Sequence, residues 1–255
     1  MTLNIWNYNQ PWGARRDLIA ACIDRAAPDV IGLQEIRVEE ERSPDDQARQ
    51  ITALVREQYH HVYRPAMTYG RDPLREEGLA ILSRWPIAAW DAVELTRDPA
   101  DDSDRHQRIL LRADLQTPAG VLHFFNTHWS LSERARLRNA TEVGAAVGRL
   151  AGAAPVVLVG DLNSRPDGGA RTLFEPSDSG EVLLRDAWTD LHPGEPGFTI
   201  TSDKPAHRID YVAYDLGGER FGRLLDIRLV CTEPTDGIFP SDHIGIVADF
   251  EIMRE

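Results

Sequence analysis

Short apolar segments separated by polar turns run along most of the chain, and this pattern predicts a protein rich in β-strands. The four apolar residues from Val156 to Val159 are typical of a strand that is buried on both faces. Similar segments predict strands at residues 2–8, 29–35, 61–65, 78–83, 107–115, 121–127, 155–160, 208–214, 225–231 and 244–251.

Apolar residues at helical spacing occur in fewer places. They predict helices at residues 14–27, 45–58 and 132–151, the last with Ser132 as its N-cap. Strands and helices alternate early in the chain, and several strands then follow in succession. This order predicts mixed sheets covered by helices, an α/β or α+β layered sandwich.

The chain of 255 residues shows no internal repeat and no linker rich in Gly, Ser and Pro. We therefore expect one domain, residues 1–255. The first residues enter a strand pattern without the features of a secretory signal, and no apolar stretch reaches membrane-spanning length. These features predict a cytoplasmic protein without a membrane-spanning segment, and they indicate no protein partner.

The sulfur-containing and large aromatic side chains are expected in the core. Cys22 and Cys231 each lie within an apolar pattern, so we expect two small buried side chains with free thiols, which suits a reducing compartment. We also expect four tryptophans to lie in the core and not on a substrate-binding surface: Trp6, Trp85, Trp90 and Trp188.

The formal net charge is −13, which is the opposite of the basic surface expected of a dedicated duplex-binding protein. Part of the acidic excess lies in polar runs at residues 38–46 and 98–104, which are typical of solvated loops. Another part could form a cluster of carboxylates that holds a cation.

Polar residues recur where predicted strands end. Because residues i and i+2 of an extended chain face the same way, several of them form pairs that can point at one place: Asn7 with Asn9, Asn126 with His128, and Asp161 with Asn163. Glu35, Asp210, Asp242 and His243 occupy comparable positions. Carboxylates with Asn and His, and without cysteine, suit a hard ion such as Mg²⁺ or Mn²⁺.

Each of these residues also has a purely structural interpretation. Asp161 could cap the turn that follows it, Glu35 could form an ion pair at a strand end, and His128 could be a hydrogen-bonded core histidine. Their repeated occurrence at strand ends, in segments far apart along the chain, favours a shared site over separate structural roles.

The motifs resemble those of the endonuclease/exonuclease/phosphatase family, which includes pancreatic-type DNases, AP endonucleases and neutral sphingomyelinases. In chain order they are W-N-x-N at 6–9, L-Q-E at 33–35, I-L-S-R-x-P-I at 81–87, N-T-H at 126–128, G-D-L-N at 160–163, R-I-D-Y at 208–211 and S-D-H at 241–243. The resemblance implies a four-layer sandwich, in which two packed, mostly antiparallel mixed sheets are flanked by helices. It also implies a metal-dependent phosphoester hydrolase that uses one or two Mg²⁺ or Mn²⁺ ions.

The resemblance further implies roles for individual residues. Glu35 would be the principal metal ligand, helped by Asn9 and Asp242, while Asp161 and His243 would orient and deprotonate the attacking water. Asp210 would hold His243 in place. Asn7 and Asn163 would contact the phosphoryl oxygens. His128 would assist the leaving oxygen or the phosphoryl group, and Glu77 would support His128. Arg71, Arg75 and Arg108 could line a groove and hold phosphate, or they could be solvated loop arginines.

The substrate implied by these motifs is a phosphodiester, either a nucleic acid or a small phosphoester. Abasic-site repair is disfavoured, because His207 stands where AP endonucleases carry a Trp. A nuclease is the first interpretation. A small-molecule or lipid-headgroup phosphodiesterase, favoured by the negative charge, is the alternative, and a non-catalytic binding module on the same fold is a third.

Overall fold

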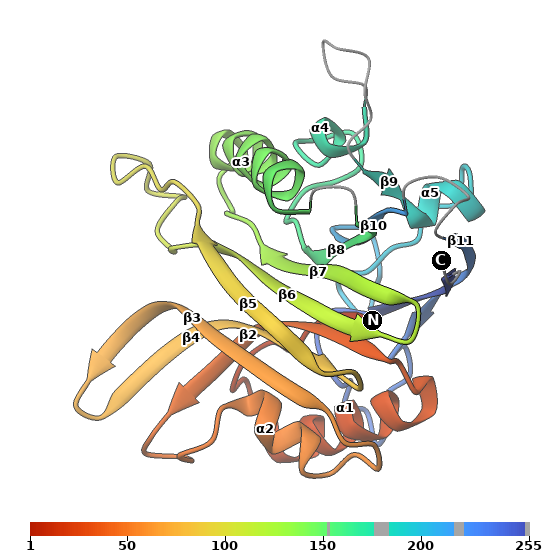
Figure 1. Cartoon of the computed structure of the whole chain (residues 1–255). Helices are drawn as coiled ribbons and strands as arrows, with labels where there is room; N and C mark the ends of the chain where they lie inside the picture. Colours follow the sequence, from red (N-terminus) through yellow and green to blue (C-terminus); the bar gives the residue numbers. More distant parts are fainter. Residues whose placement is uncertain (152–153, 176–183, 217–221, 253–255) are drawn as a thin grey trace.

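The computed structural model describes residues 1–151, 154–175, 184–216 and 222–252. Within these residues the strands form two six-stranded sheets that pack face to face, and helices lie on the outer sides (Figure 1). This arrangement is the four-layer α/β sandwich that the sequence predicts.

The first sheet combines both ends of the chain. Its strands, in spatial order, are β11 (Gly222–Val230), β12 (Gly245–Ile252), β1 (Thr2–Asn4), β2 (Val30–Glu39), β4 (Leu74–Ser83) and β3 (His60–Arg71). The pair β1–β2 is parallel, and the other pairs are antiparallel.

The second sheet is formed by the middle of the chain. Its strands, in spatial order, are β5 (Ile87–Glu94), β6 (Ile109–Thr117), β7 (Gly120–His128), β8 (Val156–Asp161), β10 (Asp210–Asp215) and β9 (Arg185–Asp186). The pair β7–β8 is parallel, and the other pairs are antiparallel.

The helices bury their apolar sides against the two sheets. Helices α1 (Trp12–Ala26) and α2 (Gln47–Thr52) pack on the first sheet through Ile19, Ile23 and Ile51, while α3 (Glu133–Ala151) and α4 (Arg171–Phe174) cover the second sheet. The short helix α5 is Ala187–Leu191. As predicted, Ser132 caps α3, because its Oγ accepts a hydrogen bond from the backbone N–H of Ala135 at 3.2 Å. Among the described residues, no helix combines the length and the apolar character needed to cross a membrane.

The parallel pairs bring polar strand ends together. In the first sheet Asn4 lies opposite Gln34, and in the second sheet His128 lies opposite Asp161. The antiparallel strand β10 adds Asp210, whose register partner is also Asp161. The polar strand ends recognised in the sequence therefore meet at one edge of the sandwich.

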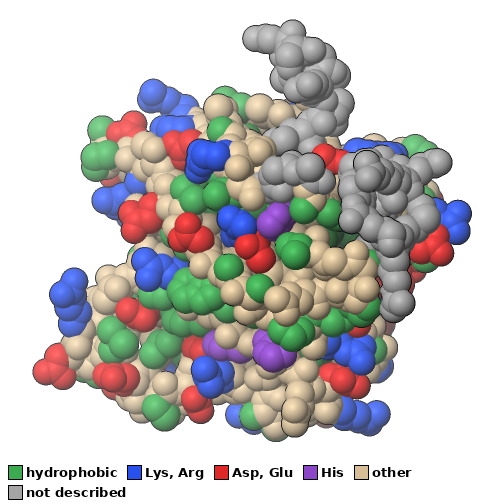
Figure 2. Space-filling model, viewed as in Figure 1, with side chains coloured by type: hydrophobic (Ala, Val, Ile, Leu, Met, Phe, Trp, Pro, Cys, Tyr) green, Lys and Arg blue, Asp and Glu red, His purple; other side chains and the backbone are tan. Residues whose placement is uncertain are grey.

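Charged side chains of both signs are interspersed over the face of the molecule shown in Figure 2. Several arginines are paired with carboxylates, among them Arg75 with Glu41 at 2.6 Å and Arg138 with Asp104 at 2.7 Å. The arginine content of the chain is therefore partly neutralised within the fold.

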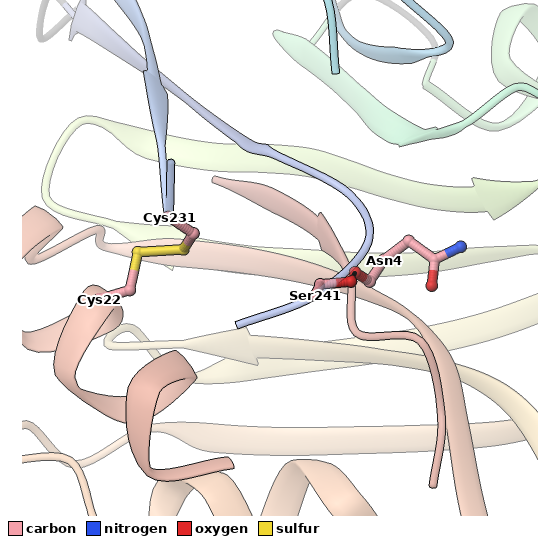
Figure 3. Close-up of a disulfide and its surroundings, with 4 residues drawn as sticks. All are labelled: Asn4, Cys22, Cys231 and Ser241. Atoms are coloured by element: carbon pink, nitrogen blue, oxygen red, sulfur yellow. Dashed lines mark hydrogen bonds between the residues drawn. A yellow bond between two sulfur atoms is a disulfide. The ribbon is translucent and has the colours of Figure 1, made fainter. Parts of the chain in front are cut away.

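The prediction of two free cysteines is wrong. Cys22 on α1 and Cys231, just after β11, form a disulfide with their Cα atoms 5.6 Å apart (Figure 3). The packing of α1 on the first sheet brings the two residues together across 209 positions of sequence, so no local pattern indicates the pairing. Because disulfides persist mainly in oxidising compartments, the cysteines no longer support the predicted cytoplasmic location.

Element boundaries differ from prediction where the backbone turns. The strand expected at 2–8 ends at Asn4, because Trp6 and Asn7 adopt left-handed φ angles of 58° and 35°. The helix expected at 45–58 is limited to Gln47–Thr52, and β5 was missed because many of its residues face solvent. Of the tryptophans expected in the core, Trp188 is buried, Trp6 and Trp85 are half-buried, and Trp90 is 51% exposed.

Candidate active site

Asp161 lies at the centre of the polar cluster, at the end of β8. Its carboxylate is buried and accepts hydrogen bonds from the backbone N–H of Asn163 at 2.8 Å and from the side-chain amide of Asn4 at 3.1 Å. Gly160 permits this placement, because a Cβ atom there would stand 2.0 Å from the carbonyl oxygen of Thr127 on the neighbouring strand.

His243 and Asp210 form a buried pair beside Asp161. The ring Nδ1 of His243 lies 2.9 Å from Asp210 Oδ2, and its Nε2 lies 3.7 Å from Asp161 Oδ2. Burial opposes the charged ring, but the carboxylates of Asp210 and Asp161 outweigh it and raise the pKa of His243 to about 10. Without a metal, this histidine is therefore an imidazolium at neutral pH.

His128 differs from His243 because its ring is neutral. Burial, reinforced by the guanidinium of Arg108, holds the pKa of His128 well below its usual range. The amide nitrogen of Asn163 donates to the Trp129 carbonyl at 3.0 Å and faces His128 Nε2 at the same distance. Since that nitrogen is a donor, Nε2 accepts and the ring proton resides on Nδ1.

The carboxyl group of Asp161 titrates near neutrality. Burial and the neighbouring charge of Asp210 raise its pKa to about 7, although His243 opposes the shift. Its Oδ2 also lies 3.3 Å from Nε2 of His128, the ring atom that carries no proton. A protonated Asp161 could donate a hydrogen bond to this Nε2 of His128, which agrees with the direction of the shift.

Glu35 lies on the other side of Asn4, at a bulge of β2. The pairing of β2 with β4 shifts register between Leu33 and Ile36, and Glu35 itself has a φ angle of 58°. Its oxygens accept amide hydrogen bonds from Asn4 at 3.2 Å and from Asn7 at 2.8 Å. Burial, with the nearby Glu77 carboxylate, raises the pKa of Glu35.

Asn4 connects the two halves of the site, and sequence analysis did not single it out. Its Oδ1 accepts from the Trp6 backbone at 3.0 Å, which directs its amide nitrogen toward Glu35 and Asp161. The signal was present, because Asn4 is a polar residue at a strand end. It was overlooked because the first strand was expected to continue to residue 8.

Asn126 has a structural role at the junction of the sheets. Its amide nitrogen donates to the carbonyls of Leu33 and Ala80 at 2.9 Å, and its oxygen accepts from Gln34 at 2.7 Å. These bonds span both sheets and hold the backbone just before Glu35.

Glu77 and Arg108 lie beside His128 around a small cavity. The Glu77 carboxylate forms an ion pair with Arg37 at 2.7 Å, so it contacts an arginine and not the histidine expected from the sequence. Arg108 is buried, its Nε has no hydrogen-bond partner, and burial lowers its pKa despite the nearby Asp161 carboxylate. A buried guanidinium with unused donors is suited to an incoming phosphoryl oxygen.

Asn9 and Asp242 lie at the outer side of the site. The side-chain amide of Asn9 bonds to Trp6 and Asn7 within its own loop, both at 3.3 Å. Asp242 is half-buried, accepts from Ser241 Oγ at 3.3 Å, and has a pKa raised by burial. Of these two residues predicted to bind metal, Asp242 is therefore the one placed beside His243.

Arg15, which sequence analysis also missed, holds the loop that carries Asn7. Its side chain is 1% exposed and donates to the carbonyls of Ile5, Trp6, Asn7, Asn9 and Pro240 at 2.7 to 3.2 Å. Beside it, Ser241 Oγ donates to the Asn4 carbonyl at 2.7 Å (Figure 3). Both contacts join the segment before His243 to the end of β1.

The donor set fits a divalent cation. Ligand atoms of Asp161, Asp210 and His243 lie within 4.8 Å of one another, and Asp210 Oδ1 is buried without a hydrogen-bond partner. Glu35 and Asp242 supply further carboxylates nearby. Oxygen-rich sets of this kind, with one imidazole, suit Mg²⁺ or Mn²⁺ better than soft metals.

The comparison with protein families agrees with this geometry. The model of the Endonuclease/Exonuclease/phosphatase family matches residues 1–243, and the chain belongs to that family. Family members are hydrolases that act on phosphoesters and generally use divalent metal ions. The comparison with curated proteins gives no match.

Solved structures show the same fold over nearly the whole chain. A family protein from Bacteroides vulgatus has a TM-score of 0.75 at 19% identity, with 99% of this chain and 97% of that chain covered. D. rerio TDP2 complexed with a single-strand DNA product has a TM-score of 0.74 at 18% identity, with coverage of 98% and 97%. The human Nocturnin catalytic domain with bound sulfate has a TM-score of 0.74 at 20% identity, with coverage of 98% and 92%.

Proposed function

We propose that the protein is a phosphodiesterase that depends on Mg²⁺ or Mn²⁺ and cleaves its substrate by in-line attack of water. The observation that carries this proposal is the buried convergence of Asp161, Asp210 and His243, linked through Asn4 to Glu35. Buried carboxylates at this density are costly unless they meet a cation or hydrogen-bond donors.

Asp161 is the best candidate for the base that accepts the proton of water. Burial and the neighbouring Asp210 raise its pKa, so Asp161 accepts a proton more readily than an exposed aspartate does. His243, held by Asp210, lies on the same side of Asp161 and orients it, so the two residues act as the pair predicted from the sequence.

The groups around this pair would bind the phosphoryl oxygens. Asn7 and Asn163 offer amide donors, and Arg108 offers a guanidinium with an unpartnered Nε. The neutral ring of His128, next to Asn163, lies where it can assist the phosphoryl group. Glu77 supports this region through its ion pair with Arg37, and substitution of Glu77 tests whether it also acts on His128.

The metal would be held by Glu35 and Asp242, with the cluster of Asp161, Asp210 and His243 as a further set of ligands for one or two ions. When bound, such an ion neutralises the phosphoryl group and stabilises the charge that develops on the leaving oxygen. The exposed amide of Asn9 is the weakest of the proposed ligands, because it bonds to Trp6 and Asn7 within its own loop.

The test is a hydrolysis panel with Mg²⁺, Mn²⁺ and EDTA. It compares bis-p-nitrophenyl phosphate, a phosphomonoester, plasmid DNA, RNA and sphingomyelin. We expect diester hydrolysis that EDTA abolishes, and a complete lack of metal-dependent turnover would instead favour a binding module. A steep loss of activity with salt would indicate a nucleic acid, whose binding releases counterions, whereas a small ester responds much less.

A further inference from the structure

A pocket of about 460 Å³ lies next to the candidate active site and shares Asp242 with it. We call it the Trp6 pocket, and the residues that define its chemistry are Trp6, Gln10, Asp203, Ile238, Phe239 and Asp242. Its volume falls within the range of ligand-binding pockets. Of these six residues, only Asp242 has a role assigned above, as a proposed metal ligand.

The walls of the Trp6 pocket are fixed by hydrogen bonds. Ser202 beside Asp203 donates its backbone N–H to the Asp242 carbonyl at 2.8 Å and its hydroxyl to the Ser241 carbonyl at 2.7 Å. Arg15 binds the Trp6 carbonyl of one wall and the Pro240 carbonyl of another, at 3.2 and 3.1 Å. The pocket is therefore formed before any ligand arrives.

The charge available inside the pocket is negative. Asp203 and Asp242 both contribute to its lining, whereas the described lining contains one cationic residue, Arg15. The guanidinium of Arg15 is already committed to backbone carbonyls and packs 5.0 Å from the centre of the Trp6 ring. The carboxylate of Asp203, which has no metal-binding role, would repel a second phosphate, so the pocket is unsuited to the neighbouring phosphates of a nucleic-acid strand.

We propose that the Trp6 pocket binds an organic cation, an alkylammonium group on one alcohol part of the phosphodiester. Aromatic side chains together with carboxylates attract such groups by cation–π and Coulomb interactions, and Trp6, Phe239 and Asp203 supply both. Because Asp242 borders the pocket and the metal-binding region, a cation in the pocket leaves its phosphate beside the catalytic residues. The proposal rests on the proposed function and narrows its substrate to a small cationic diester.

The test compares two esters with the same leaving group. One is p-nitrophenyl phosphorylcholine, and the other is p-nitrophenyl 3,3-dimethylbutyl phosphate, in which an uncharged carbon replaces the quaternary nitrogen. We expect kcat/KM to be about tenfold higher for the choline ester, which corresponds to the strength of a partly desolvated cation–π contact. Equal values for the two esters would overturn the proposal.

Substitutions then assign the effect to the pocket. Asp203→Asn should lower kcat/KM for the choline ester about fivefold, as expected for an exposed charge pair, and should not lower it for the dimethylbutyl ester, which has no cationic group. The matched control is Asp102→Asn, a fully exposed carboxylate in another loop. An equal loss on both esters would show a structural effect, and a preference for the p-nitrophenyl ester of thymidine 5′-phosphate would show a base-binding pocket. Either result contradicts the proposal.

Binding without turnover separates this proposal from the proposed function. An NMR titration of the EDTA-treated protein with choline and with 3,3-dimethylbutan-1-ol should perturb the Trp6 indole signal with choline alone, and Asp203→Asn should weaken that response. A positive titration with no hydrolysis of any ester would contradict the phosphodiesterase activity and support the pocket. Metal-dependent hydrolysis without an NMR response to choline would support the phosphodiesterase activity and contradict the proposed role of the pocket.

Discussion

Asp161 connects every part of the candidate active site at the scale of single residues. It accepts from Asn4 and from the backbone of Asn163, and it lies within 4 Å of both His128 and His243. A carboxylate so enclosed is held partly protonated by burial and by Asp210, and a cation would release that proton.

The raised pKa of Asp161 predicts that the metal-free protein loses stability as pH rises. An unfolded aspartate has a pKa of about 3.9, so between about pH 4 and 7 the folded state binds a proton that the unfolded state has released. Asp161 therefore lowers the free energy of unfolding as pH rises over this range, whereas His128, whose pKa is lowered by burial, acts in the opposite direction up to about pH 6.5. Like Asp161, His243 makes the protein less stable as pH rises. The stability that its charged ring gains from Asp210 and Asp161 is fully present below about pH 6.5 and is lost as pH rises through about 10.

Urea denaturation of the EDTA-treated protein at pH 5.5 and pH 8 measures this effect. Asp161→Asn should reduce the loss of stability between the two pH values, because the titrating carboxyl is gone. Identical pH dependence in the wild-type and Asp161→Asn proteins would contradict the shifted pKa.

Residue types at strand ends predicted much of the site, but not its exact membership. Glu35, Asp161, Asp210 and His243 were expected together and the structure brings them together, although their catalytic roles stay predictions. Asn4 was missed because the left-handed turn at Trp6 and Asn7 cannot be read from an apolar pattern. Such turns depend on tertiary contacts, here the carbonyl bonds of Arg15.

At the scale of elements, one side chain from α1, that of Arg15, binds several carbonyls of the loop after β1. Arg15 satisfies carbonyls that would otherwise be buried without partners, and it joins this loop to Pro240, just before Ser241 and Asp242. The position of Asn7 and Asp242 therefore depends on the packing of α1 against the first sheet.

Arg15→Lys should destabilise the protein and weaken metal activation. A lysine cannot reach all of these carbonyls, and each buried group left unpaired costs about 1–3 kcal/mol. We expect the free energy of unfolding to fall by about 3 kcal/mol or more and the Mg²⁺ concentration for half-maximal activity to rise. Arg16→Lys, a neighbouring arginine paired with Asp17 at the surface, is the control. Equal effects of the two substitutions would refute this role.

The disulfide is a further contact of α1, and it joins this helix to Cys231 just after β11. The double substitution Cys22→Ala with Cys231→Ala should lower the free energy of unfolding by about 2–5 kcal/mol, because the crosslink restricts the unfolded chain. Denaturation with and without dithiothreitol measures the effect, and the substituted protein should no longer respond to the reductant. An unchanged midpoint for the wild-type protein under reducing conditions would show that the cysteines are not paired.

At the scale of the whole molecule, the sandwich places both parallel strand pairs so that their polar ends meet. The layered fold was predictable from the order of apolar segments and from the motifs, because buried strands need covering layers on both faces. The pairing of the cysteines was not predictable, because only the completed fold brings Cys22 next to Cys231. The net charge of −13 and the arginine–carboxylate pairs are also properties of the whole molecule, and both agree with the small ester that we propose as substrate.

The central claim is metal-dependent phosphodiester hydrolysis centred on Asp161, and one measurement tests it most directly. The kcat for bis-p-nitrophenyl phosphate with Mn²⁺ or Mg²⁺ is compared among the wild-type protein, Asp161→Asn and the exposed control Asp102→Asn. We predict a loss of about 10²- to 10⁴-fold for Asp161→Asn with an intact fold by circular dichroism, and no loss for Asp102→Asn. Near-normal turnover by folded Asp161→Asn would contradict the account.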